Sequence, residues 1–150
     1  MDLILWRHAD AEDGAPDLER KLTAKGRKQA LRVADWLRRR LPEKFTVIAS
    51  PARRARETAE ALEESFKTVE ALAPGASVEQ ILAAAEWPGR KRPVIVVGHQ
   101  PDLGNAVAYL VGGVEADWSI RKGGLWWLES REHGGAAQVV VRAVLDPELA

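Results

Sequence analysis

Residues 93–97 of the chain are Pro-Val-Ile-Val-Val, and residues 98–101 continue as Gly-His-Gln-Pro. An unbroken run of β-branched residues between a proline and a glycine predicts a strand that is buried on both faces. Strands of this kind are typical of parallel sheets covered by helices on both sides, so the stretch predicts an α/β fold. His99 then lies in the connection between this strand and the helix that is expected to begin at Pro101.

Two earlier apolar runs end in a similar way. Leu3–Trp6 is followed by Arg7-His8-Ala9, and Phe45–Ala49 is followed by the block Ser50-Pro51-Ala52-Arg53-Arg54-Ala55-Arg56-Glu57-Thr58. In open α/β sheets, ligands bind at the carboxyl edge of the strands. The polar blocks that follow residues 6, 49 and 97 are therefore expected to meet at one edge of the sheet.

Helices are predicted between the strands from apolar residues at helical spacing and from residues that cap helix ends. A helix that begins at Thr23 should end by Pro42, and a second has Ser50 as its N-cap and Pro51 at its first position. A weaker short strand is expected within Thr68–Leu72. Ser77 and Pro101 are expected to start the last two helices, and the second of these should end at Gly112-Gly113.

The last third of the chain has a different pattern. Leu125–Glu129 and Gln138–Leu145 are strand-like and flank Arg131–Gly135, which we interpret as a hairpin loop longer than a two-residue turn. The predicted fold is a three-layer α/β/α sandwich with a mostly parallel sheet and a C-terminal antiparallel hairpin at one edge.

Length and charge limit the classes of function. The chain has 150 residues, a formal net charge of zero and no cysteine. We expect a single domain over residues 1–150, no general attraction to nucleic acid or anionic membranes, and no disulfide or thiolate metal site. The N-terminal apolar run is too short for a signal peptide or a membrane span. These features favour a cytoplasmic protein.

The three polar blocks predict a phosphate site. Convergence of the strand tips would bring Arg7, His8, Arg54 and His99 near the start of the helix expected at Pro51. Guanidinium groups and free backbone N–H groups at a helix start favour a compact anion. Arg53 and Arg56 should point away from Arg54, because neighbours on a helix do not share a face.

These blocks also resemble the three signatures of the histidine phosphatase (phosphoglycerate mutase-like) superfamily, in order and in spacing. The segments Arg20–Gly26 and Val97–Leu103 are most similar to the SixA-type phosphohistidine phosphatases within it. Arg-His-Ala here stands in place of the family's usual Arg-His-Gly, and a positive φ at Ala9 would strain the backbone.

The resemblance implies a role for each signature residue. His8 would be the nucleophile, Arg7 and Arg54 would bind the phosphoryl group, and His99 would contact it as well. Arg20 matches an arginine of the same branch and is a candidate substrate-binding residue, together with Ser50 of the second signature.

The chemistry of these residue types suits metal-free phosphoryl transfer. A neutral imidazole can attack a phosphoryl group while arginines neutralise its oxygens, so we expect a covalent phospho-His8 intermediate with no metal and no cofactor. Nearby arginines should also keep His8 neutral. No Gly-x-x-x-x-Gly-Lys loop is present.

Two features of the sequence bear on the substrate. Ester-cleaving relatives usually place an acid after the second helix, and Glu70–Gly75 has no carboxylate in the expected register. The short connection before Pro93 leaves no room for a large cap. Both features favour a phosphohistidine-bearing protein as partner, with small phosphorylated substrates as an alternative and Asp10 or Asp102 as the candidate acid. A module that binds phosphohistidine without turnover is the alternative from another class.

Overall fold

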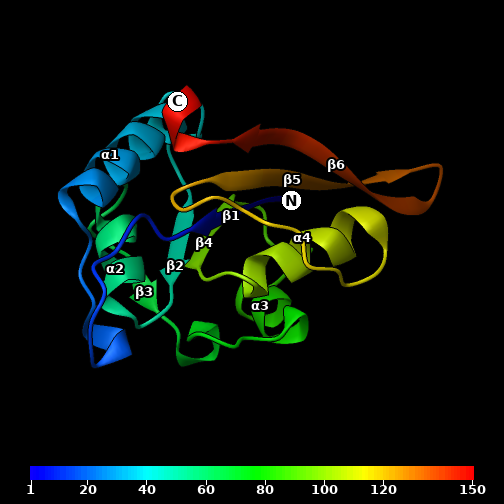
Figure 1. Ribbon diagram of the computed structural model, residues 1–150. Helices are drawn as coiled ribbons and strands as arrows, with labels where there is room; N and C mark the ends of the chain where they lie inside the picture. The colour runs from blue at the N-terminus through cyan, green and yellow to red at the C-terminus, as the bar shows by residue number, and fades with distance from the viewer.

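The computed structural model describes all 150 residues, which form one six-stranded sheet with the order β3-β2-β4-β1-β5-β6 (Figure 1). Strands β1 to β4 run parallel to their neighbours in this group, whereas β5 pairs antiparallel with β1 and with β6. The predicted mixed sheet with a C-terminal hairpin at one edge is confirmed. The strands are β1 (Asp2–Arg7), β2 (Thr46–Ala49), β3 (Lys67–Thr68), β4 (Val94–Gly98), β5 (Leu125–His133) and β6 (Ala136–Leu145).

Four helices cover the two faces of the sheet, which confirms the three-layer arrangement (Figure 1). Successive residues of β1 point to opposite faces, so Ile4 and Trp6 pack under α1 and α2 while Leu3 and Leu5 pack under α3 and α4. The helices are α1 (Ala24–Arg38), α2 (Arg53–Glu60), α3 (Val78–Ala84) and α4 (Asp102–Gly112), with short 3₁₀ turns at Asp17–Glu19, Glu70–Leu72 and Pro147–Leu149.

The sequence prediction placed the start of α2 too early, at Pro51. The helix begins at Arg53, and its N-cap residue Ala52 has no side-chain cap. Ser50 Oγ accepts a hydrogen bond from the Ala52 N–H at 3.1 Å and lies 2.7 Å from His99 Nε2. A buried imidazole therefore occupies the hydroxyl that the local sequence pattern assigned to capping. The other predicted cap is confirmed, because Ser77 and Gln80 form a reciprocal capping box at α3.

The prediction of a longer loop in the C-terminal hairpin was also wrong. Strands β5 and β6 extend to His133 and Ala136, and only Gly134 and Gly135 lie between them, with φ angles of 60° and 82°. Two successive positive φ angles are typical of a type I′ turn. The polar residues before the turn resemble a loop in sequence because this end of the hairpin is exposed, and strand residues there need not be apolar.

Two smaller differences concern element ends. In the segment Thr68–Leu72 only Thr68 belongs to a strand, because a 3₁₀ turn begins at Glu70. Helix α4 begins at Asp102, one residue after the expected start, and Gly113 ends it with a φ of 86°. None of the helices is both long and apolar enough to cross a bilayer.

Candidate active site

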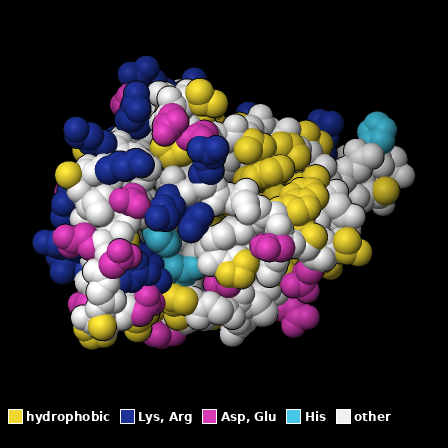
Figure 2. All heavy atoms as spheres, viewed as in Figure 1, with side chains coloured by type: hydrophobic (Ala, Val, Ile, Leu, Met, Phe, Trp, Pro, Cys, Tyr) yellow, Lys and Arg dark blue, Asp and Glu magenta, His cyan; other side chains and the backbone are white.

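A pocket of about 300 Å³ lies at the carboxyl ends of β1 and β4. Figure 2 shows histidine side chains next to each other, visible at the bottom of a region of one face that lysine and arginine side chains surround. The centroids of the His8 and His99 rings are 5.3 Å apart. The lining residues come from six separate segments: Arg7, His8, Ala11, Asp13, Arg20, Arg54, Pro74, His99, Gln100 and Lys122.

The position of the proton on the His8 ring is set by the hydrogen-bond partner of Nδ1. Nδ1 lies 2.7 Å from the carbonyl oxygen of Ala9, which can only accept, so Nδ1 carries the proton and Nε2 has a free lone pair. Burial is the main cause that lowers the pKa of His8 to about 4, and the charges of Arg54, Arg7 and Arg20 act in the same direction, against the opposing effect of the Ala9 carbonyl. The imidazole is therefore neutral at pH 7.

The turn after β1 is held by hydrogen bonds and without strain at Ala9. Glu86 is the one non-glycine residue with a positive φ, so alanine in place of glycine at position 9 costs no backbone strain. The Ala9 N–H donates to Thr58 Oγ1 at 3.0 Å, and the Thr58 hydroxyl donates to the Arg54 carbonyl at 2.8 Å. Helix α2 thus holds both the turn beside His8 and the backbone of Arg54.

His99 is fixed by two polar partners. Arg54 Nη2 lies 3.4 Å from its Nδ1, so Nδ1 accepts and the Nε2–H donates to Ser50 Oγ. The pKa of His99 is lowered to about 3, chiefly by burial and next by the neighbouring His8 and Arg54. Ser50 is completely buried and does not line the pocket, so it lies behind His99.

The arginines reach the pocket from three directions. Arg54 is only 4% exposed and donates to the Asp17 carbonyl at 2.8 Å and to the Asp17 carboxylate at 3.2 Å. The other oxygen of this carboxylate accepts from Arg20, which also donates to the Glu12 carbonyl. Arg7 donates to the Ile120 carbonyl at 2.7 Å. Asp17 therefore bridges two cations of the pocket, a contact that the sequence analysis missed.

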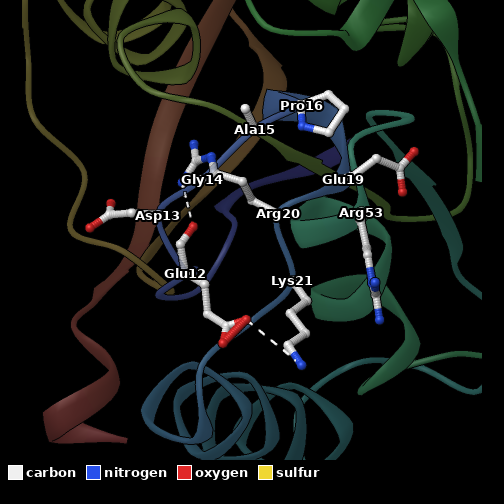
Figure 3. Close-up of a pocket in the computed structure, with 9 residues that line it drawn as sticks. All are labelled: Glu12, Asp13, Gly14, Ala15, Pro16, Glu19, Arg20, Lys21 and Arg53. Atoms are coloured by element: carbon white, nitrogen blue, oxygen red, sulfur yellow. Dashed lines mark hydrogen bonds and ion pairs between the residues drawn. The ribbon is translucent and has the colours of Figure 1, made fainter.

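Arg53 lies apart from Arg54, as predicted. It pairs with Glu57 at 3.5 Å and lines a neighbouring pocket of about 260 Å³ (Figure 3). Asp13 and Arg20 line both pockets. Figure 3 shows Arg53 coming from α2, while the loop between β1 and α1 supplies the other labelled residues.

The two carboxylates named as candidate acids are engaged elsewhere. Asp10 accepts from Thr23 Oγ1 at 2.7 Å and from Lys122 at 3.1 Å, and chiefly the Thr23 hydrogen bond lowers its pKa. Asp102 accepts from the backbone N–H groups of Gly75 and Ala76, and burial raises its pKa. Neither residue lines the pocket with His8, whereas Asp13 does.

Comparison with known proteins identifies the family. Residues 3–74 match the profile of the Histidine phosphatase superfamily (branch 1). An uncharacterized protein of Picosynechococcus is 36% identical over 99% of this chain and 93% of its own length. This chain belongs to the histidine phosphatase superfamily. An uncharacterized protein from Mycobacterium tuberculosis is 33% identical over 72% of this chain and 70% of its own length.

Within the histidine phosphatase superfamily the chain is of the SixA type. The structure of the protein histidine phosphatase SixA complexed with tungstate superposes with a TM-score of 0.80 at 26% identity and covers 98% of this chain and 97% of that one. A phosphoserine phosphatase from Entamoeba histolytica shares the fold, with a TM-score of 0.71, 15% identity, and coverage of 98% of both chains. The family profile and the SixA match support a phosphatase.

The pocket brings together four residues that were predicted from the sequence, namely Arg7, His8, Arg54 and His99. Arg20, which was also predicted, lines the same pocket. Two further predicted residues, Ser50 and Asp10, do not line it. Other lining residues were missed: Ala11, Asp13, Pro74, Gln100 and Lys122. A charge three residues before Arg20 was the one local signal for Asp17, and nothing in the local sequence pointed to Lys122.

Proposed function

We propose that the protein is a phosphohistidine phosphatase that removes the phosphoryl group from a histidine of a partner protein through a covalent phospho-His8 intermediate. One observation carries the proposal. His8 donates from Nδ1 to the Ala9 carbonyl, and its Nε2 is left as a neutral lone pair in a pocket that three arginines line. A site that only bound phosphate would need the cations but would have no use for this lone pair.

The proposed reaction has two displacements at phosphorus. Arg7, Arg20 and Arg54 bind the phosphoryl oxygens, and His8 Nε2 attacks while the bond from phosphorus to the substrate nitrogen breaks. The released imidazole takes a proton from water. A second water then attacks phospho-His8 and restores the neutral imidazole with release of inorganic phosphate.

His99 and Ser50 have distinct proposed roles. His99 lines the pocket beside His8 and contacts the bound phosphoryl group there. Ser50 is a positioning residue, because its hydroxyl accepts from His99 Nε2 and thereby fixes which ring nitrogen carries the proton. Asp17 positions Arg20 and Arg54 in the same sense.

The proposed reaction needs no metal and no other cofactor. Three guanidinium groups supply the positive charge that Mg²⁺ supplies in other phosphoryl-transfer enzymes. No three histidine or carboxylate side chains lie close enough to hold a metal ion. Turnover should therefore be unchanged by EDTA, and loss of activity that Mg²⁺ restores would contradict this part of the proposal.

A protein substrate is favoured over a small one by the absence of a cap. The segment from α2 to β4 contains only β3, a 3₁₀ turn and the seven-residue α3, so it is too short to form a large cap over the pocket. A side chain presented by another protein can reach His8 in such an open site. The small-ester alternative keeps one supporting observation, which is the carboxylate of Asp13 in the pocket lining.

The decisive experiment follows phosphorus onto His8. His8→Ala should abolish release of inorganic phosphate from phosphoramidate, and rapid quench of the wild type should trap an acid-labile, alkali-stable phosphoenzyme. His133→Ala is the matched control, because this histidine lies at the end of the hairpin, outside the pocket. Substantial activity in the folded His8→Ala variant would overturn the assignment of the nucleophile.

A further inference from the structure

The segment that joins α4 to β5 contributes Lys122 to the pocket lining, although it lies outside the part of the chain that matches the family profile. The Ile120 carbonyl accepts from Arg7 at 2.7 Å. The Gly123 N–H donates to the His8 carbonyl at 3.0 Å, and the Gly123 carbonyl accepts from the Trp6 indole at 2.9 Å. This segment is therefore fixed to β1 on both sides of Lys122.

Lys122 is the only lysine among the residues that line the pocket. Its ammonium lies 3.1 Å from Asp10 Oδ1, and its side chain is 51% exposed. An ammonium has three N–H donors. Asp10 takes one of them, which leaves donors for a ligand in the pocket.

Asp10 is itself held in place from two directions. Its second carboxylate oxygen accepts from the Thr23 hydroxyl at 2.7 Å, and its backbone N–H donates to Gln29 Oε1 at 2.9 Å. Both partners belong to the start of α1 or its cap. The carboxylate thus provides a rigid anchor for a side chain that otherwise has many rotamers.

We propose that Lys122 is a further phosphoryl-binding cation of this site, and that Asp10 is the positioning residue that orients it. The inference rests on the proposed function only in that the pocket receives a phosphoryl group. Arg54 is buried whereas Lys122 is half exposed, so Lys122 acts from the solvent side of the pocket.

The test measures binding of inorganic phosphate, which requires no turnover. Phosphate is titrated by calorimetry against the wild type and the variants Lys122→Met and Lys122→Arg. A hydrogen bond to a charged group is worth about 1.5–3 kcal/mol, so Lys122→Met should weaken phosphate binding by roughly ten-fold or more. Lys122→Arg keeps the charge and the donors and should retain most of the affinity.

Arg121→Met is the matched control for net charge. Arg121 is the neighbouring residue, its side chain is 77% exposed, and it pairs with Asp146 outside the pocket. It should leave phosphate affinity unchanged. An equal loss in Arg121→Met and Lys122→Met would mean that only the general charge matters, and no loss in Lys122→Met would remove the residue from the site.

Asp10→Asn tests the positioning role. This variant keeps an acceptor for Thr23 and removes the charge that holds Lys122, so phosphate affinity should fall by less than in Lys122→Met. The double variant should bind phosphate no more weakly than Lys122→Met alone. Additive losses would show that Asp10 acts independently of Lys122. If phosphate affinity responds as expected but no phosphoenzyme forms on His8, the inference stands and the proposed function fails. Thermal melting verifies that each variant is folded.

Discussion

The polarity of single hydrogen bonds decides the chemistry available to the two pocket histidines. His8 donates to a carbonyl and keeps a free Nε2, whereas both nitrogens of His99 are engaged by Arg54 and Ser50. With a pKa lowered to about 4, His8 loses its free lone pair only when the pH falls toward 4. It is therefore available as a nucleophile throughout the neutral range, and His99 is not.

Two adjacent arginines on α2 allow a sharp test at this scale. Arg54→Ala should lower kcat/KM by about 10²-fold or more, as loss of a preorganised charge donor does in other enzymes. Arg53→Ala should change it little, because Arg53 lies outside the His8 pocket and pairs with Glu57. Both variants are measured with phosphoramidate at equal ionic strength. A severe effect of Arg53→Ala with a mild effect of Arg54→Ala would contradict the assignment.

At the scale of elements, helix α4 is packed closely against the segment that carries Lys122. A Cβ atom added at Gly104 would lie 1.7 Å from the Trp118 carbonyl oxygen, so the backbone of that segment has to move. The Gln100 amide also donates to this carbonyl. Glycine at position 104 is therefore required by a close approach between two backbones.

Gly104→Ala should destabilise the protein by about 1–3 kcal/mol, the usual cost of overpacking. Gly112→Ala on the same helix is the control, since an added Cβ would lie 3.7 Å from the nearest Trp118 ring atom, an ordinary contact. It should be neutral or slightly stabilising, because alanine favours helix more than glycine does. Urea unfolding followed by circular dichroism measures both. Equal stability of the two variants would mean that the segment yields freely.

At the scale of the whole molecule, the sheet brings cations from three regions of the chain to one edge, while the formal net charge is zero. The acidic residues of the same region are used to hold these cations. Asp17 holds Arg20 and Arg54, and Asp10 holds Lys122. The positive charge is thus concentrated locally in a molecule whose formal net charge is zero.

Because the candidate acids Asp10 and Asp102 are engaged, the identity of the leaving group should control the rate. Imidazole leaves more easily than an alkoxide, and general acid catalysis contributes about 10²–10⁴-fold. We expect at least that preference in kcat/KM for a phosphohistidine peptide over glycerol phosphate, with p-nitrophenyl phosphate between them. All three are assayed on one preparation. Comparable rates on glycerol phosphate would favour the small-ester alternative, with Asp13 as the first residue to replace.

The sequence by itself determined the elements whose causes are local. The apolar run before His99 forms a strand wherever it lies, and the polar blocks after the β1, β2 and β4 strands follow from the chain order. Family signatures then named Arg7, His8, Arg54 and His99. The same local reasoning failed at Ser50, where a histidine 49 residues away competes for the hydroxyl, and at the hairpin end, which has no core to bury.

Only the tertiary structure decided how the site residues are held. Asp17 and Arg54 are 37 residues apart, and Asp10 and Lys122 are 112 residues apart. Hydrogen bonds over such separations leave no periodic pattern in the sequence, because they depend on where the sheet places the loops and not on neighbouring residues. The proton on His8 Nδ1 depends likewise on the direction of one carbonyl. Local sequence therefore supplies the reactive groups, and the packing of distant segments sets their protonation and position.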